Sequence, residues 1–295
     1  MAVADKRYKK YDSKNPHLSK IVNSFSDMRN FILLVFLTNF SSCQSNNTMH
    51  YREDGSLDSK GVVEEGKKEG EWTFYDTDGR LEEISTWENG QVNGLSTTFY
   101  PSGQIKSTAN WKNGLLEGKQ TIWTDSGTLL QEVIWKEDLK EGQFTSYYGI
   151  DSIATEGTFR GDLEDGIFRV YYENGNLSEE SFWVEGQKEG RAMTFSAKGQ
   201  LLSEGIYRND ERDETWKYYF KNGRIKETCT WGNGKANGLT EYYHPNGSLA
   251  GKGNFKDNQK QGDWQFYDTL DNLLRSSTYD GDECIANCDT LSKNS

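Results

Sequence analysis

The chain has 295 residues with 34% hydrophobic and 13% aromatic content, and 34 Lys/Arg residues against 46 Asp/Glu residues give a formal net charge of −12. This acidic balance argues against nucleic-acid binding, because phosphate backbones would be repelled, and against binding to anionic lipid headgroups. The low hydrophobic content fits a thin two-faced sheet better than a thick globular core.

The first recognisable element is a compact signal peptide that begins at Met28. Arg29 supplies a basic start, residues 31–40 (FILLVFLTNF) form an apolar run, and the small residues Ser41 and Ser42 precede Cys43. The apolar run is too short to span a bilayer, which needs about 20 apolar residues. We interpret residues 1–27 as an upstream extension and expect translation to start at Met28.

This segment resembles a bacterial lipoprotein signal, although Phe40 stands where that family usually has Leu. The resemblance implies cleavage before Cys43, a diacylglyceryl group on the Cys43 thiol and acylation of the new amino terminus. The expected location is the periplasmic side of a bacterial envelope membrane, with the outer membrane favoured; a cytoplasmic protein is the alternative. Loss of residues 1–42 removes seven Lys/Arg and three Asp/Glu residues and leaves a net charge of about −16.

From Gly70 onward the sequence repeats every 24 residues without insertions, and we count repeat positions from zero at Gly70. Position 0 is glycine in eight of nine repeats, with Glu214 as the departure. Position 9 is Gly or Asp, types that tolerate left-handed torsions in tight turns. Positions 5 and 17 are always aromatic and position 11 is always aliphatic.

This pattern resembles the MORN-repeat variant family over roughly residues 46–283. The resemblance implies a fold more firmly than a function. Eukaryotic members are mostly scaffolds or membrane-associated modules, and many bacterial relatives carry an antitoxin label. Two short runs rich in aromatic or β-branched residues in each repeat, separated by Gly/Asn/Asp turns, independently indicate one β-hairpin per repeat.

We therefore predict an all-β fold, an elongated solenoid-like sheet of successive antiparallel hairpins with a 24-residue step. About twenty strands at ~4.8 Å each give a sheet of roughly 95 Å that must twist or curl. Side-chain parity predicts that positions 5, 11 and 17 form the core face and that positions 2 and 4 point the other way. The predicted segments are the extension and signal peptide (1–42), a tether with a degenerate repeat (43–69), nine MORN-like repeats (70–283) and a C-terminal cap (284–295).

Positions 2 and 4 are strongly aromatic in only some repeats, which suggests either a groove for a partner or a lining closed by the sheet's own curl. The predicted binding face consists of Trp72, Phe74, Trp216, Tyr218, Trp264 and Phe266.

Four cysteines are present, of which Cys229 lies at a strand position and is expected to be structural. We expect Cys284 and Cys288 to form a disulfide that caps the end of the array in an oxidising periplasm. A metal or redox pair is the alternative, but their spacing lacks the usual two intervening residues.

Catalytic and metal sites are not indicated. The only histidines are His17, His50 and His244, and no Ser-His-Asp or metal-ligand set can be nominated; we take His244 to be an exposed turn residue. The acidic stretch 76–79 (DTDG) lacks the bidentate Glu of a calcium loop and is better explained by turn chemistry. No enzyme activity, cofactor or metal is expected.

The leading functional interpretation is a lipid-anchored, non-catalytic cell-envelope protein that acts as a scaffold or as a protein- or glycan-binding module. Its expected partners are the membrane, through the lipid anchor, and another envelope protein or glycan, but not nucleic acid. The alternative is a cytosolic antitoxin-like protein that binds and neutralises a partner protein.

Overall fold

The computed structural model describes residues 47–288. The predicted start at Met28, the signal peptide and Cys43 lie outside these residues. Within them the chain forms 22 β-strands and no helix.

The strands follow one another at short intervals along the whole described chain. Their bounds are β1 Asn47–Tyr51, β2 Leu57–Glu64, β3 Lys67–Tyr75, β4 Leu81–Glu88, β5 Gln91–Phe99, β6 Ile105–Lys112, β7 Leu115–Trp123, β8 Leu129–Lys136, β9 Leu139–Gly149, β10 Ser152–Arg160, β11 Leu163–Glu164, β12 Gly166–Tyr171, β13 Leu177–Val184, β14 Gln187–Phe195, β15 Leu201–Arg208, β16 Glu211–Tyr219, β17 Ile225–Gly232, β18 Lys235–Tyr243, β19 Leu249–Lys256, β20 Gln259–Tyr267, β21 Leu273–Asp280 and β22 Glu283–Ala286.

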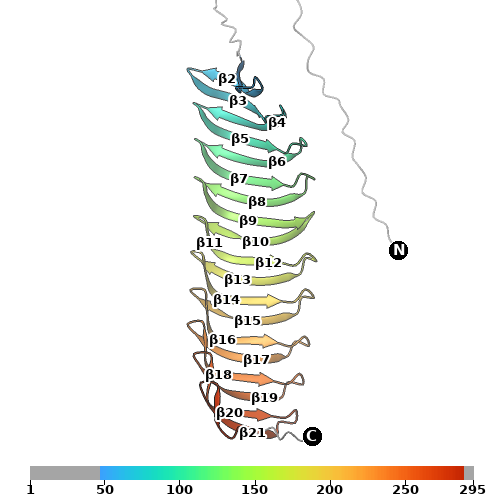
Figure 1. Cartoon of the computed structure of the whole chain (residues 1–295), viewed down its shortest axis with the longest axis vertical. Helices are drawn as coiled ribbons and strands as arrows, with labels where there is room; N and C mark the ends of the chain where they lie inside the picture. The colour runs from blue at the N-terminus through green and yellow to red at the C-terminus, as the bar shows by residue number, and fades with distance from the viewer. Residues whose placement is uncertain (1–46, 289–295) are drawn as a thin grey trace, which may run out of the picture. The chain divides into compact units, whose positions relative to one another are not determined.

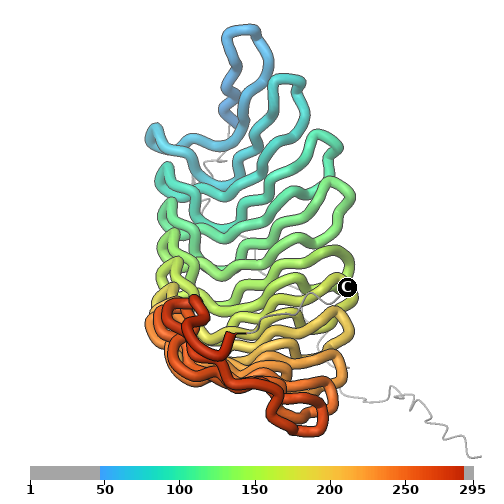
Figure 2. The backbone as a smooth tube through the Cα atoms, turned by 60° about the horizontal axis from the view of Figure 1, so that its bottom comes forward, coloured from blue at the N-terminus to red at the C-terminus, as the bar shows by residue number. Residues whose placement is uncertain are grey.

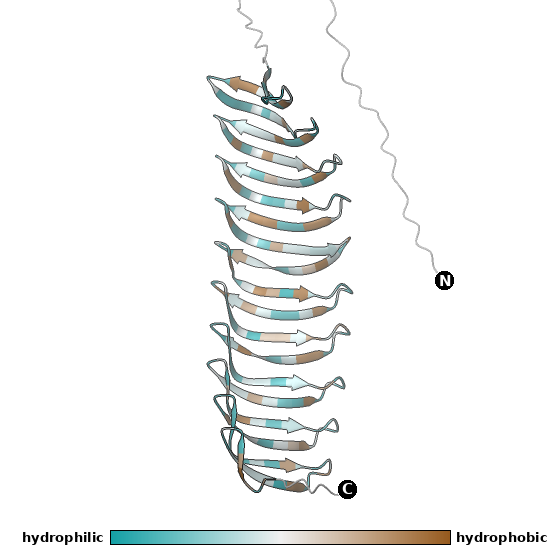
Figure 3. Ribbon diagram, in the orientation of Figure 1, coloured by the Kyte–Doolittle hydropathy of each residue, from teal (hydrophilic) through white to brown (hydrophobic). Residues whose placement is uncertain are grey.

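Each strand pairs antiparallel with the next one along the chain, so that the hairpins stack into a single open sheet (Figure 1). The one irregularity is β11, a two-residue strand that pairs with β10, which also pairs directly with β12. The predicted fold class, a solenoid-like sheet of successive hairpins, is confirmed. Hydrophobic and hydrophilic stretches are interleaved in hairpin after hairpin rather than gathered in one apolar block (Figure 3).

Two kinds of turn alternate along the sheet. Between β4 and β5, Glu88 pairs with Gln91, and the two central residues, Asn89 and Gly90, have φ angles of 53° and 84°, as a type I′ turn requires. Between β3 and β4 the backbone N–H of Gly79 donates to the carbonyl of Asp76 (3.0 Å), and Gly79 has a φ of 77°. Positive φ is found at all the position-9 glycines, as their residue type predicts, and Asp151 (54°) and Asp271 (63°) at the same position share it.

The glycine at position 0 is required by a left-handed backbone beside a β-bulge. In the pairing of β4 with β5, Ser85 faces Ser96 but Trp87 already faces Val92, so three residues of β5 oppose one of β4. Gly94 lies in this bulge with a φ of 113°. Glu214, the only non-glycine at position 0, adopts the same region with a φ of 59°.

Each hairpin is bent near its middle, as the tube in Figure 2 shows. On one face the mid-strand side chains are almost completely buried although no second layer covers them within residues 47–288; Trp72, Ser85 and Trp264 are each 0% exposed. Such burial in a single sheet requires that the sheet folds toward that face. We call this face, which carries positions 2, 4, 13, 15, 17 and 22, the inner face, and the opposite face the outer face.

The predicted assignment of side chains to faces was wrong for position 17. Positions 5 and 11 share a face opposite to positions 2 and 4, as predicted, but position 17 lies with positions 2 and 4. Trp87 at position 17 contacts Phe74 at position 4, with ring centroids 6.2 Å apart, so these positions share the inner face. Tyr171 at position 5 instead donates to Glu156 on the outer face (2.7 Å). The reason is a register shift next to each three-residue turn. Position 12 has no partner there, because position 11 pairs with position 5 and position 13 pairs with position 4. The alternation of side chains between the two faces therefore reverses between positions 11 and 13.

The predicted core positions are correspondingly less buried than expected. Side chains at positions 5, 11 and 17 are mostly half-buried, and Ile105 and Leu273 at position 11 are 42% and 55% exposed. The buried core consists instead of positions 2 and 15, which meet along the centre of the inner face.

Positions 15 and 2 of successive repeats are matched in size. Where position 15 is glycine, the next repeat has a large ring at position 2, as in Gly205 with Trp216; a Cβ on Gly205 would lie 2.2 Å from that ring. The same relation joins Gly61 to Trp72, Gly157 to Phe168 and Gly253 to Trp264. Where position 15 carries a side chain, position 2 of the next repeat is smaller in four of five cases, for example Ser181 with Ala192.

The exception in this series is Phe144, which follows Val133. Val133 is 1% exposed, whereas Phe144 is only half-buried. Phe144 pairs with Gly157 in its own hairpin, and its ring contacts Phe159 edge-on at 5.5 Å. The Phe144 ring therefore also lies opposite a glycine, but this glycine, Gly157, is on the following strand β10 and not on the preceding strand β8.

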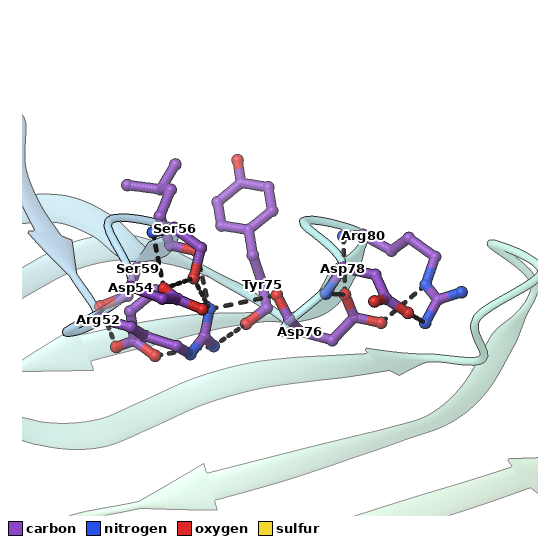
Figure 4. Close-up of polar contacts among 10 residues, drawn as sticks. Arg52, Asp54, Ser56, Ser59, Tyr75, Asp76, Asp78 and Arg80 are labelled. Carbon is purple, nitrogen blue, oxygen red and sulfur yellow. Dashed lines mark hydrogen bonds and ion pairs between the residues drawn. The ribbon is translucent and has the colours of Figure 1, made fainter.

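Side chains in the turns bind neighbouring hairpins together. At position 6, the hydroxyl groups of Tyr100, Tyr148 and Tyr172 each donate to a backbone carbonyl in the next repeat at 2.8 Å. His244 makes the equivalent contact, with its Nε2 atom 3.0 Å from the Tyr267 carbonyl oxygen. It is therefore half-buried and joins two hairpins, and the prediction of an exposed turn residue was wrong. In the degenerate repeat Arg52 takes this role, contacting the carbonyls of Tyr75 and Asp76 (Figure 4).

The steric match at positions 15 and 2 predicts the effect of Gly205→Ala. The backbone of Gly205 is not left-handed, so the added methyl group acts only by pressing on Trp216, and we expect the free energy of unfolding to fall by about 1–3 kcal/mol. The control is Gly232→Ala, because nothing lies within 4 Å of its Cβ. Chemical denaturation of Gly205→Ala, Trp216→Ala and the double variant should show that the double loses less than the sum of the singles. Simple additivity would contradict the match.

The left-handed backbone at Glu214 predicts that Glu214→Gly stabilises the protein, by about 1 kcal/mol, because an L-residue in this region is strained. Glu214 also pairs with Arg208 (2.5 Å) on the surface, so Glu214→Ala is the control that removes the ion pair but keeps the Cβ atom. We expect Glu214→Gly to have a higher melting temperature than Glu214→Ala. The reverse order would show that position 0 does not select for backbone conformation.

Candidate functional site

The inner face contains all six residues of the predicted binding face, but three of them are not available to a partner. Trp72, Trp216 and Trp264 are 0%, 2% and 0% exposed. They fill the bend against position 15, so these three side chains fit the alternative of a closed lining and not that of an open groove. Phe74, Tyr218 and Phe266 lie beside them, with ring centroids 6.3–6.4 Å away, and remain half-buried.

The accessible rings of the inner face are the half-buried aromatic residues at position 17. Their indole N–H groups are mostly bound to side chains at positions 15 and 2. Trp87 and Trp183 donate to Ser85 and Ser181 within the same strand (3.0 and 2.9 Å), and Trp111 donates to Ser96 (2.7 Å). These bonds fix the ring orientation, so that the rings form a regular row along the sheet.

A series of basic side chains at position 22 lies over these rings. Arg212 has its guanidinium carbon 4.8 Å from the Trp216 ring and 4.9 Å from the Trp231 ring, and Lys260 lies 5.0 Å from Trp264 and 4.8 Å from Tyr279. Lys68 is surrounded by Trp72, Phe74 and Trp87 at 4.3–4.5 Å, and burial lowers its pKa. Such cation–π contacts hold the charged ends above the aromatic row.

This series of basic residues was not predicted, although the 24-residue repeat frame shows a pattern at position 22. Position 22 is basic in five of nine successive repeats and apolar or acidic in the others; the residues in order are Lys68, Val92, Leu116, Lys140, Glu164, Lys188, Arg212, Ala236 and Lys260. Because the hairpins with Val92, Leu116 or Ala236 at this position keep the same strand pairing, the basic residues are not needed for folding. We call Lys68, Lys140, Lys188, Arg212 and Lys260 the inner basic series.

The inner face also carries a few carboxylates, which makes its charge mixed. Glu179 pairs with Lys188 at 2.6 Å. Glu227 lies between Tyr218 and Tyr242 on the two neighbouring strands, and its burial raises the pKa of its carboxyl group. In the described part of the chain no carboxylate lies within ion-pair distance of Lys140, Arg212 or Lys260.

Of the three cysteines within residues 47–288, two form a disulfide and the third is buried. Cys284 and Cys288 are joined by a disulfide with their Cα atoms 5.7 Å apart. Cys229 is 3% exposed, accepts a hydrogen bond from the Thr240 hydroxyl (3.2 Å), and has its pKa raised by burial, which disfavours the reactive thiolate.

The acidic turn at residues 76–79 is held together by its own hydrogen bonds. Asp76 in the acidic turn accepts hydrogen bonds from the backbone N–H groups of Asp78 and Arg80 and from the Arg80 side chain (Figure 4), and these bonds, the Arg80 side chain first, lower the pKa of its carboxyl group. Residues 47–288 contain no group of three His, Cys, Asp or Glu residues that could hold a metal ion. Nor do they contain a helix long and apolar enough to cross a membrane.

Four segments of the chain match the MORN repeat variant family model, namely residues 68–89, 92–113, 164–185 and 236–257. The predicted resemblance is thus confirmed for these four repeats. MORN repeats are generally non-catalytic and suggest a repeat-based binding or scaffold module. No curated protein matches the chain.

Solved structures with partial similarity include the crystal structures of TcdB2-TccC3-TEV and TcdB2-TccC3 and the Photorhabdus luminescens Tc holotoxin pore with the TccC3 D651A mutation. The alignments cover 78%, 81% and 80% of this chain at 10%, 10% and 12% identity, with TM-scores of 0.19, 0.20 and 0.16. This chain spans only 14%, 17% and 17% of those chains. Similarity at this level supports no statement about fold or function.

The raised pKa of Glu227 predicts a pH-dependent effect of Glu227→Gln. A carboxyl group whose pKa is higher in the folded state costs stability as the pH rises through that pKa, whereas both side chains are neutral at low pH. We therefore expect the melting temperature of the Gln variant to exceed that of the wild type at pH 8 and the difference to shrink toward pH 4. An advantage that is constant from pH 4 to pH 8 would mean that packing, not charge burial, distinguishes the two.

Proposed function

We propose that the chain is a non-catalytic binding module that uses its inner face to hold an acidic polypeptide segment of another envelope protein. The observation that carries this proposal is the inner basic series. Its five residues lie over a regular aromatic row in a chain that is otherwise strongly acidic, at a position where regular hairpins also accept apolar residues.

The chemistry of the inner face favours an extended acidic segment. The repeat step is two strands, or about 9.6 Å, so basic groups one to three steps apart lie along a line that an extended polypeptide can follow over several repeats. The half-buried rings at position 17 add apolar contact area between these charges. The carboxylates Glu179 and Glu227 interrupt the basic groups and disfavour a uniformly charged polyanion such as a sulfated glycan.

The test compares two triple variants with the same change in net charge. Lys140→Gln, Lys188→Gln and Arg212→Gln neutralise the inner face, whereas Lys112→Gln, Lys136→Gln and Arg160→Gln neutralise exposed side chains at position 18 on the outer face. Binding of a fluorescent peptide rich in Glu and Tyr is measured by anisotropy at two salt concentrations. We expect the inner triple to weaken binding about tenfold, since three exposed contacts contribute roughly 0.5 kcal/mol each, and the outer triple to leave it unchanged.

Two outcomes would overturn this part of the proposal. Equal loss in both triples would show that net charge alone matters. Binding of a heparin fragment without binding of the peptide would identify a glycan as the partner instead. Thermal unfolding of both triples shows whether any loss follows from altered folding.

We further propose that Cys43 anchors this module to the periplasmic side of a bacterial envelope membrane. The supporting features are Arg29, the apolar run 31–40 and the small residues before Cys43. Two or three acyl chains hold a protein firmly, at ~0.8 kcal/mol per buried methylene, without a membrane-spanning helix.

The anchor is tested by expressing wild type and Cys43→Ser in a Gram-negative host. We expect labelled palmitate in the wild type only, a wild-type mass that lacks the residues before Cys43, and membrane partitioning that the variant loses. Equal partitioning, or a wild-type mass that retains residues 28–42, would contradict the anchor. That result would favour the cytosolic antitoxin-like alternative.

A further inference from the structure

The two ends of the sheet differ in how their outer strands are protected. At the C-terminal end β22 has only four residues, and the Cys284–Cys288 disulfide closes the chain behind it. Asp280, Asp282 and Glu283 place negative charge along this edge, and the Ser277 hydroxyl donates to the Asn287 carbonyl (2.8 Å). Short length and charge are the usual means by which proteins prevent strands from pairing at a sheet edge.

The N-terminal strand β1 is also short, with five residues, but it has neither the charge nor the disulfide. Strand β1, with the sequence NTMHY, contains no Lys, Arg, Asp or Glu residue, and within residues 47–288 only β2 pairs with it. Two of its apolar side chains are exposed. Tyr51 is 61% exposed and Met49 is 52% exposed, and the Tyr51 hydroxyl reaches only the sulfur of Met49 (3.3 Å).

The other repeats provide an internal comparison for β1. Tyr51 occupies position 5, where aromatic residues such as Tyr75 and Tyr171 are half-buried because a strand lies on each side of them. On the inner face, His50 lies 5.5 Å from the buried ring of Trp72 and so extends the aromatic row to the edge. Strand β1 therefore has the side chains of an internal strand but only one neighbour.

We propose that β1 pairs with β1 of a second copy of this chain, antiparallel about a two-fold axis near Met49. A second copy suits this edge because β1 is uncharged, so two identical strands meet without repulsion. In this arrangement Met49 faces Met49 of the second copy, and Thr48 faces His50. The axis is perpendicular to the sheet, so the inner faces of the two copies lie on the same side and join into one continuous surface.

Such a pair would double the length of the inner face without any new binding site. A segment that engages repeats of both copies would gain avidity through its effective concentration. The pairing itself does not depend on the acidic-segment proposal, because it rests only on the edge strand. One pair of five-residue strands is small beside the ~800 Å² per partner of stable complexes, so we expect reversible pairing at roughly micromolar concentrations.

Cross-linking tests the position of the axis. In the full chain with Cys43→Ser, the remaining cysteines are a disulfide pair and the buried Cys229, so a new thiol is the only accessible one among the described residues. Under mild oxidation we expect Met49→Cys to form a disulfide-linked dimer in high yield. Leu270→Cys is the matched control, because Leu270 is 79% exposed in a turn at the far end of the sheet and should remain largely monomeric.

Sedimentation provides the second measurement. The Cys43→Ser chain should show a concentration-dependent monomer–dimer equilibrium between roughly 1 and 100 μM. Adding Met49→Lys, which places two like charges across the axis, should leave only monomer while the circular dichroism spectrum stays unchanged. A monomer at all concentrations, a dimer that survives Met49→Lys, or equal cross-linking of Met49→Cys and Leu270→Cys would each overturn the proposal.

Discussion

The whole sheet depends on the contact between position 15 of one repeat and position 2 of the next. These side chains meet at the centre of the bend, where no second layer from residues 47–288 covers them, so each hairpin must shield its neighbour. A Trp ring pressed against a glycine, as at Gly253 and Trp264, and a pair of small residues, as at Ser181 and Ala192, are two solutions to the same volume requirement. Close packing makes intermediate solutions costly.

The sequence was sufficient to predict the strands and turns because a 24-residue period repeats the same evidence nine times. The tips at glycines such as Gly79 followed from turn chemistry alone. The faces could not be predicted by counting odd and even positions, because register shifts beside the turns reverse the alternation between Leu81 and Glu83. A local bulge of one residue is invisible in a pattern of residue types, yet it moves every later side chain to the other face.

The same limitation explains the outcome for the candidate site. Trp72, Trp216 and Trp264 were correctly placed together on one face, but their burial arises from the bend, which depends on left-handed residues within bulges. Once the frame is known, the repeats separate folding from function. Trp216 at position 2 recurs as Trp in only some repeats but is buried and serves the fold, whereas a basic residue at position 22, such as Arg212, gives way to Val, Leu or Ala in regular hairpins and is available for recognition.

Within residues 47–288 each strand pairs only with the next strand or, at β10 and β12, with the next but one, and this has a consequence for how the protein folds. Every strand pair and every hydrogen bond between turns, such as Tyr172 to the Phe195 carbonyl, joins residues no more than about one repeat apart. Contact order therefore stays low however many repeats are added, in contrast to most all-β proteins, whose distant strands must first close long loops. A hairpin can dock as soon as it is synthesised, so the sheet can grow from its N-terminal end while translation continues.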